Sequence, residues 1–210
     1  MTFSAHRGRD MASPRSTTGG SDLGRSQKFL SVVVALVIVI AIAIRVHAWL
    51  TPFPFFVDEV LVAENLLTRS ALALWKPLEL AQTAPPLFLV AEKAIGGVFG
   101  YSETAMRALP LIAGCALLPM AWFVSRPLVS AEARVVLVAL LAFSPSVIFY
   151  ADFLKQYSSD VLTTLVIIAV TLRALRTPDW RHVIGVAIVG VVAILFRARA
   201  FFCLPALGQA

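Results

Sequence analysis

The chain has few charged residues and almost no cysteine. Asp, Glu, Lys and Arg make up only 14% of its 210 residues, whereas a soluble domain has about 25%. The two cysteines, Cys115 and Cys203, lie in apolar stretches without the short spacing of a metal site. We therefore expect small buried thiols rather than a disulfide or a redox site. The net charge is +6, and the basic residues lie at the ends of the apolar runs, as is typical of membrane proteins. We therefore expect no nucleic-acid partner.

Apolar residues dominate instead. They make up 59% of the sequence, and the mean hydropathy is +0.85, as is typical of a membrane protein. The first apolar run covers 29–44 and extends to residue 50 without a small-residue cleavage site. We predict an uncleaved transmembrane helix rather than a signal peptide. Residues 1–28, rich in Ser, Gly, Thr and Arg, predict a disordered cytoplasmic tail before a membrane module at 29–210.

Further apolar runs each approach the roughly 17–25 residues that a membrane span needs. They cover residues 108–125, 133–151, 158–175 and 182–196. The sequence therefore predicts an all-α, polytopic protein of the plasma (inner) membrane, with about five transmembrane helices.

Segment 84–99 decides the topology. It is short, begins with two prolines and carries the charged pair Glu92-Lys93. We expect it to lie in the interface rather than to span. The basic connections around 126–134 and 173–181 then fall on the cytoplasmic side with the N-terminus, as the positive-inside rule requires. Residues 51–107 become the first extracytoplasmic loop.

Within that loop, residues 58–74 predict an amphipathic helix on the membrane surface. The positions assigned to its apolar face are Val60, Leu61, Ala63, Leu67, Ala71 and Leu74. The positions assigned to its polar face are Glu64, Asn65, Thr68 and Arg69.

The acidic pair Asp58-Glu59 follows the first span, where carboxylates are costly and are often functional. The plainer alternative is that the pair solvates a loop or caps the next helix. A second outer loop, around 150–158, carries Asp152 on the same predicted side. Two such carboxylates can bind a divalent cation, and one can act as a general base.

Basic residues accompany these carboxylates and could hold a phosphate leaving group at the membrane surface. They are Lys93, Arg107, Lys155, Arg197 and Arg199. Each could instead be an anchor at a helix end, and Tyr157 could be an aromatic residue of the interface. Taken together, the charges suit transfer from a lipid-phosphate donor to a hydroxyl acceptor.

Short sequence pieces in a fixed order carry a family resemblance. They are Asp58-Glu59, Pro85-Pro86-Leu87-Phe88, Phe99-Gly100-Tyr101-Ser102-Glu103 with Arg107-Ala108-Leu109-Pro110, Phe143-Ser144-Pro145, and Asp152-Phe153-Leu154-Lys155-Gln156-Tyr157-Ser158-Ser159-Asp160. This order resembles the GT-C membrane glycosyltransferases related to protein O-mannosyltransferases and to the lipid A aminoarabinose transferase.

The resemblance implies an inverting transferase that uses a polyprenyl-phosphate sugar and a hydroxyl of a lipid, glycan or protein. It implies that Asp58, beside Glu59, is the catalytic base. It also implies that Asp152 organises the site or, with Asp58, holds a divalent metal such as Mg, Mn or Zn. Lys155 then stands near the donor phosphate, and the active site is extracytoplasmic.

The chain departs from the family pattern in two respects. Where many relatives carry Lys-Pro-Pro, this chain has Ala84-Pro85-Pro86, so Lys93 or Lys155 would have to replace the missing lysine. Family members are also longer, so we expect the N-terminal part of such an enzyme. A catalytically silent truncated paralogue or assembly subunit is one alternative. A transporter is another, although transporters keep polar groups near the bilayer midplane.

Overall fold

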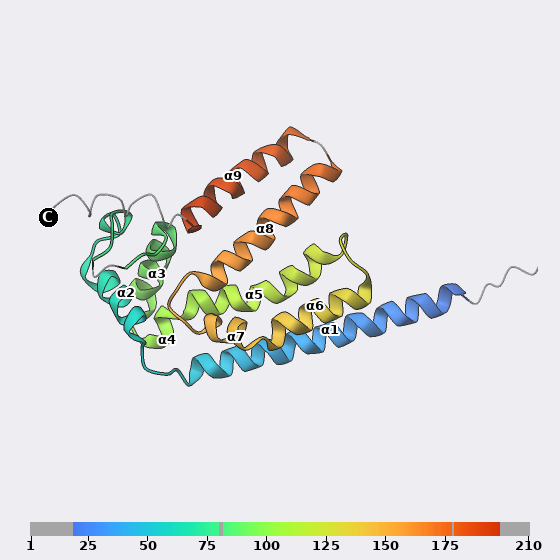
Figure 1. Ribbon diagram of the computed structural model, residues 1–210, viewed down its shortest axis with the longest axis horizontal. Coiled ribbons are helices and arrows are strands. Elements are labelled where there is room, and N and C mark those ends of the chain that lie inside the picture. The colour runs from blue at the N-terminus through green and yellow to red at the C-terminus, as the bar shows by residue number, and fades with distance from the viewer. Residues whose placement is uncertain (1–18, 80–81, 178, 198–210) are drawn as a thin grey trace, which may run out of the picture.

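The protein is described by a computed structural model over residues 19–79, 82–177 and 179–197, and within these ranges every regular element is helical. A bundle of long helices ends in a group of short ones (Figure 1). The bundle contains α1 (Gly19–Leu50), α5 (Ala108–Ser125), α6 (Ala131–Phe143), α7 (Pro145–Ala151), α8 (Tyr157–Arg176) and α9 (Trp180–Arg197). The short elements are α2 (Val57–Thr68), the 3-10 turn η1 (Ala73–Trp75), α3 (Pro86–Phe99) and α4 (Glu103–Met106).

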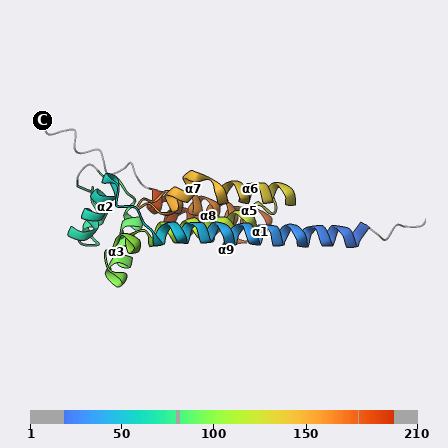
Figure 2. The same cartoon turned by 90° about the horizontal axis from the view of Figure 1, so that it is seen from below.

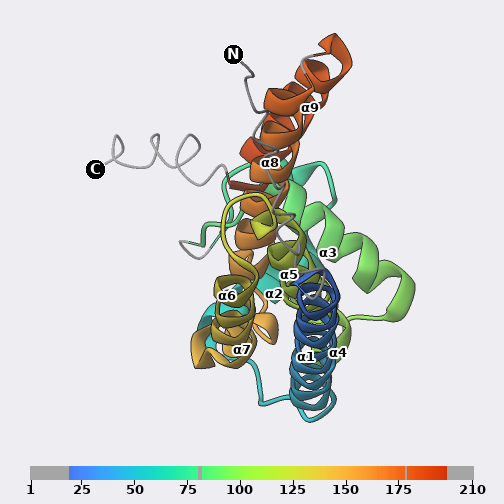
Figure 3. The ribbon, with the colours of Figure 1, turned by 90° about the vertical axis from the view of Figure 1, so that its right-hand side faces the viewer.

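We call residues 51–107 the cap, and the end of the bundle that carries it the cap end. The α5–α6 and α8–α9 connections lie at the opposite, far end, beyond which α1 extends (Figures 1 and 2). Seen end-on, α5 lies between the α8–α9 pair and the α1–α6 pair (Figure 3). The cap and the loop at 152–156 therefore meet at one end of the bundle.

In the part of the chain that the structure describes, three helices are long and apolar enough to cross a membrane: residues 27–50, 108–125 and 157–176. Helices α6 and α7, bent by 56° where they join, form a fourth candidate if they are counted as one span. The apolar part of α9, which contains the predicted run 182–196, is shorter. These helices support a polytopic membrane protein with three or four candidate spans. Helix α3 is not among them, as expected for segment 84–99.

The bend between α6 and α7 is capped by a buried arginine of α1. Pro145 begins α7 and has no N–H, so the carbonyl of Leu141 lacks its helical donor. Arg45 supplies one: its Nη2 lies 3.1 Å from the Leu141 oxygen, and its Nη1 lies 3.1 Å from the Ala142 oxygen. Because unsatisfied carbonyls are costly in a bilayer, this contact stabilises the bend and joins α1 to α6.

Close packing then fixes α7 against α5. A Cβ built on Gly114 of α5 would lie 2.5 Å from the Cβ of Ala151, which is closer than two carbon atoms can approach. The absence of a side chain at residue 114 lets α7 end against α5. This contact sets where the loop at 152–156 begins.

Helix α2 buries a different face from the predicted one. Its buried residues are Glu59, Val62, Ala63, Asn65 and Leu66, and the helix ends at Thr68 rather than near residue 74. The predicted apolar positions Val60 and Leu67 are exposed. The helix turns this way because Asn65 and Glu59 have partners inside the cap: the Asn65 Oδ1 accepts a hydrogen bond from the Glu79 N–H at 3.1 Å.

The first helix begins before the apolar run. Residues 19–28, where the sequence predicts disorder, are helical in α1, because adding turns to an existing helix costs little once it is nucleated. The remainder of the predicted tail, residues 1–18, lies outside the described residues, as do Arg199 and Cys203.

Candidate functional site

Glu59 connects the cap to the loop at 152–156. Its carboxylate accepts hydrogen bonds from Arg107, with the Nε–Oε1 distance 2.9 Å and the Nη2–Oε2 distance 2.7 Å. It also accepts the N–H of Leu154 at 2.8 Å. Both charged side chains are buried, with exposed fractions of 0% for Glu59 and 1% for Arg107. A buried, bidentate ion pair of this kind fixes the positions of the two segments that it joins.

Local sequence explains why Glu59 is placed there. It is the third residue of α2, and its Oε2 also accepts the Phe56 N–H at 3.1 Å, so it caps the helix. Arg107 stands between α4 and α5. It donates its Nη1 to the Phe53 oxygen at 2.8 Å, and its guanidinium lies 4.9 Å from the centre of the Phe55 ring. The pair therefore ties together the start of the cap, the α4–α5 junction and the second loop.

The predicted roles of these two residues would require that pair to open. In the described conformation the Glu59 oxygens and the three guanidinium nitrogens of Arg107 all bond to protein groups. Glu59 thus acts as a positioning residue, and its bond to the Phe56 N–H agrees with the alternative that this acid caps the helix. Arg107 is 1% exposed, and each of its three nitrogens already donates to Glu59 or to Phe53.

Asp58 has the opposite environment. It lies in the first turn of α2, next to Glu59, but its side chain is exposed. No described residue hydrogen-bonds to its carboxylate. Glu59 therefore holds a helix end that presents a free carboxylate to solvent.

Asp152 follows α7 and is half-buried. Burial raises the pKa of this carboxyl, the nearby positive charge of Arg107 opposes that rise, and the negative charge of Glu59 adds to it. The Asp152 Oδ1 is buried and has no hydrogen-bond partner among the described residues. Asp152 therefore lies within electrostatic reach of the Glu59–Arg107 pair and carries an unused acceptor.

The remaining predicted phosphate-binding cations have different environments. Lys155 is buried, and its Nζ donates to the Gln82 Oε1 at 2.8 Å, which ties the second loop to the segment before α3. The Nζ of Lys93 donates to the Leu66 oxygen at 2.6 Å. Arg197 is the last residue of α9, which ends at the cap end (Figure 1). Lys155 thus follows directly on Leu154, whose N–H binds Glu59.

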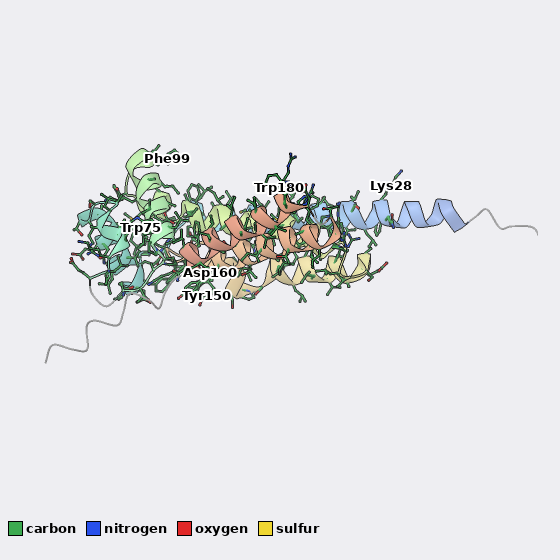
Figure 4. The ribbon with its side chains drawn as sticks, turned by 90° about the horizontal axis from the view of Figure 1, so that it is seen from above. Lys28, Trp75, Phe99, Tyr150, Asp160 and Trp180 are labelled. Carbon is green, nitrogen blue, oxygen red and sulfur yellow. The ribbon has the colours of Figure 1, made fainter. Side chains whose placement is uncertain are left out.

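Sequence reasoning missed an aromatic cluster beside this site. Phe56, Phe149, Tyr150, Phe153 and Tyr157 form a chain of ring contacts, with centroids 4.6 to 6.1 Å apart. Figure 4 places Tyr150 near the cap and Lys28 toward the far end. The signal was present as aromatics crowded into residues 149–157. The exposed rings of Phe56, Phe149 and Tyr150 offer apolar surface to a sugar or to a lipid chain.

The residues partly fit the implied metal. Among residues 19–79, 82–177 and 179–197, no three His, Cys, Asp or Glu side chains gather in a metal-binding group. With Glu59 engaged, the predicted site carboxylates that remain are Asp58 and Asp152. Mg²⁺ is commonly held by one or two carboxylates together with substrate phosphates, so these two residues suit a cation that shares a donor phosphate, rather than one caged by protein ligands.

Comparison of the chain with family models, with curated proteins and with solved structures found no match.

Proposed function

We propose that the protein is an inverting glycosyltransferase, which moves a sugar from a polyprenyl-phosphate donor to a hydroxyl acceptor at the cap end. One observation carries the proposal. The Glu59 carboxylate binds Arg107 and the Leu154 N–H together, which holds the Asp58 helix end and the Asp152 loop at the same end of the bundle. The resemblance to GT-C enzymes, which place acidic residues in the same order, supports it.

The chemistry assigns different tasks to the two aspartates. Asp58 is exposed and takes the proton of the acceptor hydroxyl, whose oxygen attacks the anomeric carbon. The bond from that carbon to the phosphate oxygen breaks, and the polyprenyl phosphate leaves with inversion at carbon. Lys155, which donates to Gln82 in the described conformation, turns to the leaving phosphate and offsets its negative charge. Asp152 would help to hold a divalent cation, which would supply positive charge to the leaving phosphate.

The proposal includes an orientation. Five spans, with α6–α7 counted as one and α9 included, put the N-terminus in the cytoplasm and the cap outside the plasma membrane. The basic residues around the far-end connections support this orientation. They are Arg126, Arg134, Arg173, Arg176 and Arg181. A lipid-linked donor would then approach the cap end from the outer leaflet.

The test is transfer of radiolabelled sugar from polyprenyl-phosphate donors in membranes that contain this chain. General-base catalysis contributes about 10²–10⁴-fold, so Asp58→Asn should lower turnover within that range while the amount of folded protein stays constant. Glu64→Gln is the matched control, because it neutralises another exposed carboxylate of α2. Transfer that is absent, or that is equal in wild type and Asp58→Asn, would contradict the proposal and favour a silent assembly subunit.

A further inference from the structure

A cavity between α5 and α8 lies at the far end of the bundle, away from the candidate site. Its volume is about 600 Å³, within the range of small-molecule sites. Residues from the last turns of α5 and α8 form its walls. Met120, Phe123 and Leu172 contribute to its apolar surface, and three arginines, Arg126, Arg173 and Arg176, line it as well.

The charge on this cavity is uncompensated. None of its described lining residues is Asp or Glu, and the ion pair found among the described residues is the distant Arg107–Glu59. Three guanidinium groups that share one cavity repel one another unless an anion joins them. The cavity therefore favours a ligand that carries negative charge.

Neighbouring groups hold two of the arginines without neutralising their charge. The Arg126 guanidinium lies 4.7 Å from the centre of the Phe123 ring. Arg173 donates its Nε to the His182 Nε2 at 3.3 Å, which leaves both terminal nitrogens for a ligand. Such forks match the oxygens of a phosphate.

We infer that this cavity binds an anionic membrane phospholipid, with the phosphate on the arginines and the start of the acyl chains against the apolar wall. A lipid is favoured over a free phosphate because apolar residues make up most of the wall, and they would gain nothing from a small hydrated ion. The centre of the Trp122 ring lies 6.0 and 4.5 Å from the guanidinium groups of Arg126 and Arg134, and a tryptophan among arginines is typical of a membrane interface.

The test measures lipid binding to the purified full chain, after delipidation, with vesicles of phosphatidylcholine alone or mixed with phosphatidylglycerol. Wild type should retain phosphatidylglycerol selectively in native mass spectrometry. The double variant Arg173→Gln/Arg176→Gln should lose roughly 25-fold in affinity, about fivefold for each arginine. Arg173→Lys/Arg176→Lys keeps the charge but loses the forks, so it should lose less affinity than the glutamine variant, which shows that the loss is not a folding defect.

The control removes two basic residues from the same end but outside the cavity, as Lys28→Gln/Arg181→Gln. If attraction to the lipid surface were unspecific, both double variants would lose equally, and the inference would be overturned. Equal retention of the two lipids would overturn it as well. Displacement of phosphatidylglycerol by millimolar inorganic phosphate would identify a site for free anions instead of a lipid site.

Discussion

At the scale of single residues, neighbouring carboxylates do different work. Asp58 is exposed, whereas Glu59, one position along α2, is buried and bonded to Arg107 and to Leu154. A helix points successive side chains about 100° apart, so adjacent acids face different surroundings. The sequence shows the pair but not which member faces the interior, because that depends on Arg107, 48 positions away in the chain.

Glu59→Gln should therefore act on folding rather than on catalysis. The substitution leaves the Arg107 charge buried without its partner, a change that costs about 3–5 kcal/mol. We expect the yield of folded protein in detergent and its thermal unfolding temperature to fall. Any activity per folded molecule should fall less than in Asp58→Asn. Normal stability with a large loss of turnover would instead show that Glu59 is the base.

Glu92 is a buried acid that the proposed chemistry does not use. It lies in α3 with no exposed surface, and neither oxygen has a hydrogen-bond partner among the described residues. Burial raises the pKa of Glu92 from 4.5 to about 9. In neutral solution this carboxyl is protonated in the folded chain, whereas in the unfolded chain it is ionised.

A pH dependence of stability follows from that difference. Because the folded state binds the extra proton, the contribution of Glu92 to stability is greatest below pH 4.5 and falls as the pH rises to about 9. The fall is roughly 1.4 kcal/mol per pH unit at most. Glu92→Gln should flatten this slope in thermal unfolding measured across pH, while the exposed control Glu64→Gln should not. Parallel wild-type and Glu92→Gln curves would contradict the assignment.

At the scale of helices, sequence patterns predicted most elements. The apolar runs 108–125 and 158–175 correspond to α5 and α8, since length and hydropathy decide such helices. The run 133–151 is instead divided at Ser144–Pro145 into α6 and α7. The proline is visible in the sequence. The contact of Arg45 with the carbonyls at the bend is not, because Arg45 lies 96 and 97 positions from Leu141 and Ala142 in the chain.

Arg45→Leu tests that connection. Removing the guanidinium leaves the Leu141 and Ala142 carbonyls without their donor, and we expect a loss of about 2–4 kcal/mol in the free energy of unfolding. Adding Pro145→Ala to Arg45→Leu restores an N–H for the Leu141 carbonyl, so part of the loss should return in denaturant titrations. Additive effects of the two substitutions would mean that Arg45 does not cap the bend.

At the scale of the whole molecule, composition and charge predicted an all-helical membrane protein with helix 84–99 outside the spans, and α3 is not a candidate span. The sequence also predicted that residues 51–107 and the second loop share one end. The structure joins them through the Glu59 Oε1 and the Leu154 N–H. The burial of Arg107 and Lys155 could not be predicted, because it arises from contacts between segments far apart in the chain.

The most direct test of a shared site is the sidedness of its two loops. In a chain with its native cysteines replaced, single cysteines at the exposed positions Thr83, Tyr150 and Ser130 would be treated on intact cells with a membrane-impermeant thiol reagent. We predict that cysteines at Thr83 and Tyr150 react from outside, and that one at Ser130 reacts only after permeabilisation. Reaction of Thr83 and Tyr150 from opposite sides, or of Ser130 together with Thr83, would contradict a single extracytoplasmic site.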